Sequence, residues 1–112
     1  MSHDNLVQTV EDLVTLQVIL ESAGEKPVII DFFAVWCPPC QAIKPKYHEW
    51  AKQFEGKVIF CQVDVDQASE LVAAMQISAM PTFKFFKNGS EIHSIRGADA
   101  QGILNKLNEL VK

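Results

Sequence analysis

The sequence predicts an α/β protein with a mixed sheet of four or five strands and helices on both faces of that sheet. Three observations support this class: two apolar runs suited to central strands, helix-periodic stripes between the strands, and a late hairpin signal. The expected order is βαβαβαββα. The early βαβ units require parallel pairing with right-handed crossovers, and the hairpin adds antiparallel strands.

The chain is expected to open with a short strand at Leu6–Gln8. Thr9 is expected to cap the helix that follows, with Glu11 and Asp12 in its first turn, where carboxylates favour the helix dipole. Gly24 is the expected stop, because glycine readily adopts the left-handed conformation that ends helices.

The middle of the chain supplies the expected central strands, Val28–Phe33 and Lys57–Val63. Continuous apolar runs of this kind suit strands that are covered on both faces. A helix is expected between them, with its apolar stripe at Ile43, Tyr47, Trp50, Ala51 and Phe54. A short helix is expected at Asp66–Ala74, capped by Asp66.

The last third is expected to form a hairpin and a helix. Strands at Thr82–Lys87 and Glu91–Ile95 flank Asn88-Gly89, a strong signal for a two-residue turn. Asp99 is expected to cap the final helix, whose stripe is Ile103, Leu104, Leu107, Leu110 and Val111.

Length and charge limit the class of protein. The 112 residues suffice for one core, so we expect a single domain over 1–112. A net charge of −4 argues against binding to nucleic acid or to anionic membranes. No segment approaches the ~20 apolar residues of a membrane helix. No secretory or transit signal is recognisable at the N-terminus, so a cytoplasmic protein is expected. The chain is also expected to be a monomer.

Cys37 and Cys40 form a C-x-x-C pair next to a βαβ pattern, a spacing used in redox sites and in metal sites. Tetrahedral zinc needs four ligands, and His3, His48 and His93 lie at unsuitable spacings. We therefore expect no metal and a redox-active pair.

The pair is expected between the strand ending near Phe33 and the next helix, which places Cys37 at a helix N-terminus. The dipole and free N–H groups there favour a thiolate. Cys37 would attack a substrate disulfide, and Cys40, one turn further in, would resolve the mixed disulfide.

The motif Trp36-Cys37-Pro38-Pro39-Cys40 resembles the Trp-Cys-Gly-Pro-Cys active site of the thioredoxin family. Further matches in the same order are Pro45, Met80-Pro81-Thr82, Asn88-Gly89 and Gly97. The stretch Val58–Asp66 looks most like the animal cytosolic branch. The resemblance covers nearly the whole chain and implies the thioredoxin fold and protein disulfide reduction.

The resemblance also implies a supply of electrons and a set of partners. No cofactor is bound, and reducing equivalents come from NADPH through thioredoxin reductase. The substrates are disulfide-containing proteins such as peroxiredoxins, methionine sulfoxide reductases or a ribonucleotide reductase.

Site residues follow from the same resemblance. Asp31 matches a buried aspartate beneath the resolving cysteine; burial would raise its pKa and let it deprotonate Cys40 through a water. The Met80–Pro81 bond is expected to be cis. The surface that contacts substrate is expected to comprise Trp36, Met80, Pro81, Gly97 and Ala98.

Three positions depart from the family pattern or stand outside it. Pro38 replaces the usual glycine and lacks an N–H, so Pro38 and Pro39 are expected to tune the redox potential; either the helix starts later or Pro38 is held against its preference. Gln62 stands where bacterial members often carry a lysine near the buried aspartate. Cys61 lies in an apolar strand and is expected to be core.

Three alternatives remain open from the sequence. The Pro-Pro pair is typical of tryparedoxins, so the chain is alternatively a tryparedoxin-like carrier with a different reductant. A redox-sensitive binding module would use the same surface. An oxidant or isomerase is the third reading.

Overall fold

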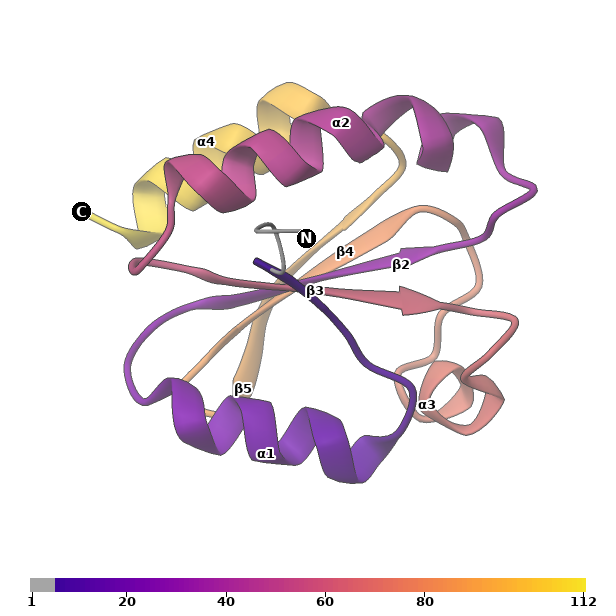
Figure 1. Cartoon of the computed structure of the whole chain (residues 1–112), viewed down its shortest axis with the longest axis horizontal. Helices are drawn as coiled ribbons and strands as arrows, with labels where there is room; N and C mark the ends of the chain where they lie inside the picture. Colours follow the sequence, from indigo (N-terminus) through magenta and orange to yellow (C-terminus); the bar gives the residue numbers. More distant parts are fainter. Residues whose placement is uncertain (1–5) are drawn as a thin grey trace, which may run out of the picture.

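The computed structural model describes residues 6–112, which form one five-stranded sheet and four helices (Figure 1). In chain order the elements are β1 (Val7–Thr9), α1 (Leu13–Ala23), β2 (Val28–Phe33), α2 (Pro38–Gln53), β3 (Ile59–Asp64), α3 (Ser69–Ala74), β4 (Thr82–Lys87), β5 (Ser90–Arg96) and α4 (Ala100–Leu110). The predicted class and the order βαβαβαββα are confirmed.

The sheet has the order β1-β3-β2-β4-β5. β1 and β2 each pair parallel with β3, whereas β4 pairs antiparallel with β2 and β5. The sheet is therefore mixed, as the early crossovers and the late hairpin predict.

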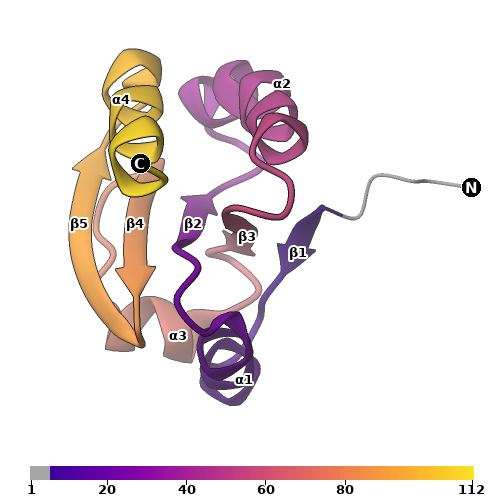
Figure 2. The ribbon, with the colours of Figure 1, turned by 90° about the vertical axis from the view of Figure 1, so that its left-hand side faces the viewer.

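Two apolar layers sandwich the sheet (Figure 2). Helices α2 and α4 cover one face, and α1 and α3 cover the other. Every residue of β2 is buried, and successive side chains alternate between the layers. Ile29 packs in the cluster beneath α2 and α4, while Ile30 and Phe32 pack in the cluster of the opposite face.

The start of α1 differs from the prediction. Asp12 caps the helix by accepting a hydrogen bond from the Thr15 N–H at 2.7 Å, so neither it nor Glu11 lies in the first turn. Thr9 is the last residue of β1, where its hydroxyl accepts a hydrogen bond from Gln62. The cap prediction for Thr9 was wrong because strand pairing holds that residue extended.

The start of α3 differs as well. The helix begins at Ser69, and its N-cap residue, Ala68, makes no side-chain cap bond. Asp66 lies in the preceding turn, where its N–H donates to Asp64 Oδ1 at 3.0 Å. The prediction that Asp66 caps the helix was wrong, because its carboxylate accepts a hydrogen bond from Trp36 instead.

The hairpin and the last helix follow the sequence signals. Asn88 and Gly89 have φ of 54° and 80°, the left-handed geometry that a two-residue turn of this type requires. Asp99 caps α4 through a hydrogen bond from Gly102 N–H at 3.0 Å. Across residues 6–112, every helix is too short or too polar to cross a membrane.

Candidate active site

Four connections meet at one edge of the sheet. The parallel strands β2 and β3 both end there, at Phe33 and Asp64. The antiparallel strand β4 starts there at Thr82, and β5 ends there at Arg96, directly opposite Thr82. The topology therefore gathers the segments after Phe33, Asp64 and Arg96 and the segment before Thr82, although they are far apart in sequence.

A disulfide joins Cys37 to Cys40 at this edge, so the structure shows the oxidised protein. Helix α2 begins at Pro38, so the proline pair does not delay the helix. Cys37 is the N-cap residue, and its Sγ accepts a hydrogen bond from the Cys40 N–H at 3.3 Å. Because Pro38 and Pro39 lack an N–H, this amide is the first one that the helix offers.

Both cysteines are buried, Cys37 at 5% and Cys40 at 2% exposure. They pack with Phe33 and Ala34 at the end of β2, and Met80 covers them from the loop before β4. The predicted burial of Cys40 is confirmed.

The Met80–Pro81 peptide bond is cis, as predicted. The carbonyl oxygen of Met80 lies 3.7 Å from Cys37 Sγ, which places this backbone directly beside the disulfide. The Pro81 carbonyl accepts a hydrogen bond from the Gly97 N–H at 2.8 Å. Gly97 thus lies against this loop, and Ala98 follows it on the surface.

Trp36 precedes the disulfide and is 63% exposed. Its indole Nε1 donates a hydrogen bond to Asp66 Oδ2 at 2.9 Å, across 30 residues of sequence. A large apolar ring held in solvent by a charged partner suits contact with another molecule better than core packing.

Asp31 lies in the middle of β2 and is 3% exposed. Among residues 6–112, its Oδ1 has no hydrogen-bond partner. Burial raises the pKa of Asp31 from its ordinary value of 3.8 to about 7, and attraction by the Lys44 ammonium group limits the rise. Near neutral pH, both the protonated and the ionised form of the Asp31 carboxyl group are therefore populated.

The comparisons with known proteins agree with this geometry. The thioredoxin family model matches residues 7–109. Rabbit thioredoxin (Oryctolagus cuniculus) is 39% identical over 106 residues, which cover 95% of this chain and all of the rabbit protein. Thioredoxin of the sponge Geodia cydonium is 51% identical over 89 residues, covering 79% of this chain and 83% of the sponge protein.

Solved structures give the same result. Thioredoxin from Fasciola hepatica superposes with a TM-score of 0.89 at 33% identity, covering 94% of this chain and 99% of that one. The short form of thioredoxin f from spinach chloroplast superposes with a TM-score of 0.88 at 33% identity, covering 95% and 94%. The chain belongs to the thioredoxin family.

This thioredoxin is a thiol–disulfide oxidoreductase, and its redox pair is the C-x-x-C motif of Cys37 and Cys40. The fold predicted from the resemblance, the thioredoxin fold, is confirmed. The relatives include a chloroplast protein and also a mitochondrial one, thioredoxin 3 of Saccharomyces cerevisiae, at 25% identity and a TM-score of 0.86.

Two side chains of this thioredoxin act at the predicted site although the sequence did not assign them to it. Asp66 holds Trp36, and Lys44 is the cation that acts on Asp31. Topology signals the first, because residues that follow neighbouring parallel strands meet at one sheet edge. Helix periodicity signals the second, because Lys44 follows Cys40 by four residues.

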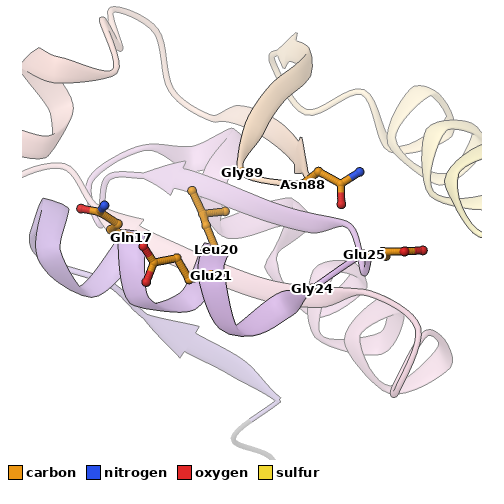
Figure 3. Close-up of a pocket in the computed structure, with 7 residues that line it drawn as sticks. All are labelled: Gln17, Leu20, Glu21, Gly24, Glu25, Asn88 and Gly89. Carbon is orange, nitrogen blue, oxygen red and sulfur yellow. The ribbon is translucent and has the colours of Figure 1, made fainter.

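Other features of this thioredoxin lie away from the redox edge. A shallow cavity between α1 and the β4–β5 turn is found at the opposite edge (Figure 3), lined by Gln17, Leu20, Glu21, Gly24, Glu25, Asn88 and Gly89. Between residues 6 and 112, no three His, Cys, Asp or Glu side chains gather closely enough to hold a metal ion. His3, weighed above as a ligand, lies outside the described residues.

Proposed function

We propose that Cys37 is the attacking thiol of this reductase and Cys40 the resolving thiol. The observation that carries the assignment is the N-cap position of Cys37, whose sulfur accepts the Cys40 N–H at 3.3 Å. The same N–H and the helix dipole stabilise a thiolate on Cys37 in the reduced protein.

The reaction then takes two exchanges. The Cys37 thiolate attacks one sulfur of the substrate disulfide, which forms a mixed disulfide and releases the first substrate thiolate. The Cys40 thiolate next attacks Cys37 Sγ, which forms the Cys37–Cys40 disulfide and releases the second substrate thiolate. Two electrons pass from the dithiol to the substrate, and two protons complete its thiols.

Asp31 is the proposed proton acceptor for the Cys40 thiol, acting through a water molecule. It lies on the face of β2 that α2 covers, two residues before Phe33, which packs against both cysteines. A carboxyl group with a pKa of about 7 suits proton transfer near neutral pH, since it accepts and returns a proton readily.

The substrate surface is proposed to comprise Trp36, Met80, Pro81, Gly97 and Ala98. The Met80 carbonyl, 3.7 Å from the Cys37 sulfur, is available to an extended substrate backbone, as in strand addition. The exposed ring of Trp36 supplies apolar contact area next to the attacking sulfur.

Residues 1–112 are proposed to form a single, monomeric thioredoxin domain of the animal type, working in the cytoplasm. Electrons would come from NADPH through thioredoxin reductase. Its proposed substrates are oxidised peroxiredoxins, methionine sulfoxide reductases and ribonucleotide reductase. The net negative charge of the chain supports the proposal that neither nucleic acid nor membranes are among its partners.

Insulin disulfide reduction tests the proposal, with NADPH and thioredoxin reductase in one series and a small dithiol in the other. Turnover in both series is expected for wild type. Cys37→Ser is expected to abolish it, while Cys40→Ser is expected to accumulate a mixed disulfide with insulin, seen on nonreducing gels.

Other outcomes point elsewhere. Turnover with the small dithiol alone indicates a different reductant, as in a tryparedoxin-like carrier. Absence of turnover in both series contradicts the reductase and favours the redox-sensitive binding module. If Cys37→Ser, and not Cys40→Ser, accumulates the mixed disulfide with insulin, then Cys40 is the attacking thiol and Cys37 the resolving thiol.

Pro38 and Pro39 are proposed to tune the redox potential, because neither offers an N–H to the Cys37 thiolate. Pro38→Gly restores one amide and is expected to change the equilibrium potential measured against glutathione. Identical potentials for the two proteins would exclude this role for Pro38.

A further inference from the structure

The positive charge that lowers the pKa of the buried Asp31 carboxyl group is that of Lys44 on helix α2. We propose that Lys44 is a positioning residue for the Asp31 proton, setting the pH range over which Asp31 is ionised and Cys40 can be activated. This rests on the proposed role of Asp31 in the reaction; the effect of Lys44 on Asp31 itself can be measured independently.

Strand and helix periodicity bring the two side chains to the same interface. Ile29, Asp31 and Phe33 alternate onto the face of β2 beneath α2. On α2, Lys44 follows Cys40 by one turn, so it lies on the side of the helix that faces the sheet. Its Nζ lies over the ring of Phe33, 5.1 Å from the centroid.

The aromatic contact restrains the ammonium group over Phe33, two residues along β2 from Asp31. Lys44 is half-buried, with its stem along the apolar surface and its charge over the negative face of the Phe33 ring. Partial burial also lowers the local dielectric constant, so its charge acts on Asp31 more strongly than that of a fully solvated lysine.

No charged residue stands directly opposite Asp31 in the sheet. Gln62 on β3 and Phe83 on β4 stand directly opposite it in the sheet, and neither is ionisable. The amide of Gln62 is turned toward Thr9 and donates to its hydroxyl at 3.2 Å. The position where bacterial relatives often carry a lysine is therefore neutral here.

Asp64 ends β3 on the same face, opposite Phe33, and its Oδ1 accepts a hydrogen bond from the Asp66 N–H. Two buried titratable groups nearby, Tyr47 and Cys61, are neutral near pH 7. The hydroxyl of Tyr47 on α2 shares its proton between the carbonyls of Cys61 and Ile29, at 2.7 and 3.2 Å, and burial raises its pKa well above 10. Burial likewise raises the pKa of Cys61 to about 12. Lys44 thus supplies the positive charge for Asp31 from among the described residues.

The direct test is the pKa of the Asp31 carboxyl group, followed by carbon-13 NMR in Lys44→Gln. Loss of the cation is expected to raise this pKa by about 0.5 to 1, because an opposite charge beyond contact distance lowers a carboxyl pKa by less than a close one. Lys44→Arg, which keeps the charge, is expected to remain within about 0.3 of wild type.

Lys46→Gln is the matched control. Lys46 lies on the same helix, is exposed, and changes the net charge by the same amount when replaced. It is expected to leave the Asp31 pKa unchanged. An equal rise in both glutamine variants would assign the effect to net charge, and an unchanged pKa in Lys44→Gln would overturn the proposal.

The kinetic consequence is read in the rate at which Cys40 resolves a mixed disulfide, measured by stopped flow. In Lys44→Gln this rate is expected to fall about 3- to 10-fold at pH 6 but less than about 2-fold at pH 8, where at least about half of Asp31 is ionised in both proteins. A merely structural role for Lys44 would lower the rate equally at both values.

Asp31→Asn separates this inference from the proposed function. If Asp31→Asn keeps the wild-type rate and pH profile, the proton-acceptor role fails, and the kinetic part of the inference fails with it. The raised Asp31 pKa in Lys44→Gln would still stand as a measured effect of Lys44. If Asp31→Asn slows resolution while Lys44→Gln changes neither pKa nor rate, the role of Asp31 survives and the inference about Lys44 is wrong.

Discussion

Replacing Asp31 by Asn is expected to stabilise the oxidised protein at alkaline pH, because the wild type must bury a carboxylate there. The pKa of this group is about 7 in the folded protein and 3.8 ordinarily. At about 1.4 kcal/mol per pH unit, this interval corresponds to about 4 kcal/mol of unfolding free energy. Asn has nearly the same shape and carries no charge, so the variant avoids this cost.

The sign follows from proton binding. Between pH 3.8 and about 7 the folded protein holds the Asp31 proton and the unfolded chain releases it. The unfolded state therefore binds fewer protons, and the stability of wild type falls as the pH rises through this window. Above about pH 7 both states are ionised, and the cost stays constant.

Urea denaturation of both oxidised proteins at pH 5 and pH 8.5 checks this expectation. The stability of Asp31→Asn relative to wild type should increase by roughly 3 kcal/mol between the two values. Comparing the change with pH cancels the constant effect of the amide in the core. A difference that is independent of pH, or that shrinks toward pH 8.5, would refute the reasoning that Asp31 is buried with a raised pKa.

Three further expectations concern other contacts of the structure. Asp66→Ala removes the acceptor of the Trp36 indole, so we expect a changed Trp36 fluorescence spectrum and a higher KM for insulin with little effect on stability; an unchanged spectrum and KM would show that the hydrogen bond does not hold the ring. Tyr47→Phe leaves the carbonyls of Cys61 and Ile29 without the hydroxyl and should cost about 1 to 3 kcal/mol of unfolding free energy in urea; a cost near zero would contradict a buried, bonded hydroxyl. Cys61 is fully buried, and burial raises its pKa to about 12, so iodoacetamide should label it at pH 8 only after unfolding, as mass spectrometry would detect. Rapid labelling of Cys61 in the native protein would place it at the surface.

Much of the fold is encoded locally, and the sequence alone determined it. Asn88-Gly89 specifies its turn because both residues must adopt positive φ, and the structure has both there. The apolar run at Val28–Phe33 identifies a strand buried on both faces, which β2 is. The C-x-x-C pair, lying between that strand and a helical stripe, indicated the redox site and its place at a helix N-terminus.

Competing local signals were harder to rank. Thr9 and Asp12 are both good N-cap residues, and only pairing of Thr9 with β3 decides that Asp12 caps α1. Asp66 likewise has a side chain suited to capping a helix, but its carboxylate accepts a hydrogen bond from Trp36, 30 residues earlier in the sequence. Local propensity does not settle which of these residues caps a helix, since it takes no account of a partner on another strand.

The electrostatics of the site were decided by tertiary structure. The sequence places a carboxylate in an apolar run, which predicts a raised pKa for Asp31 but not its neighbours. Gln62 and Lys44 are separated from Asp31 by 31 and 13 residues. Only sheet register places the neutral Gln62 opposite Asp31, and only helix phase brings the Lys44 cation over Phe33, close enough to lower the Asp31 pKa. Such interactions depend on distance and burial, and both are fixed when the chain packs, because charges remote in sequence become neighbours only then.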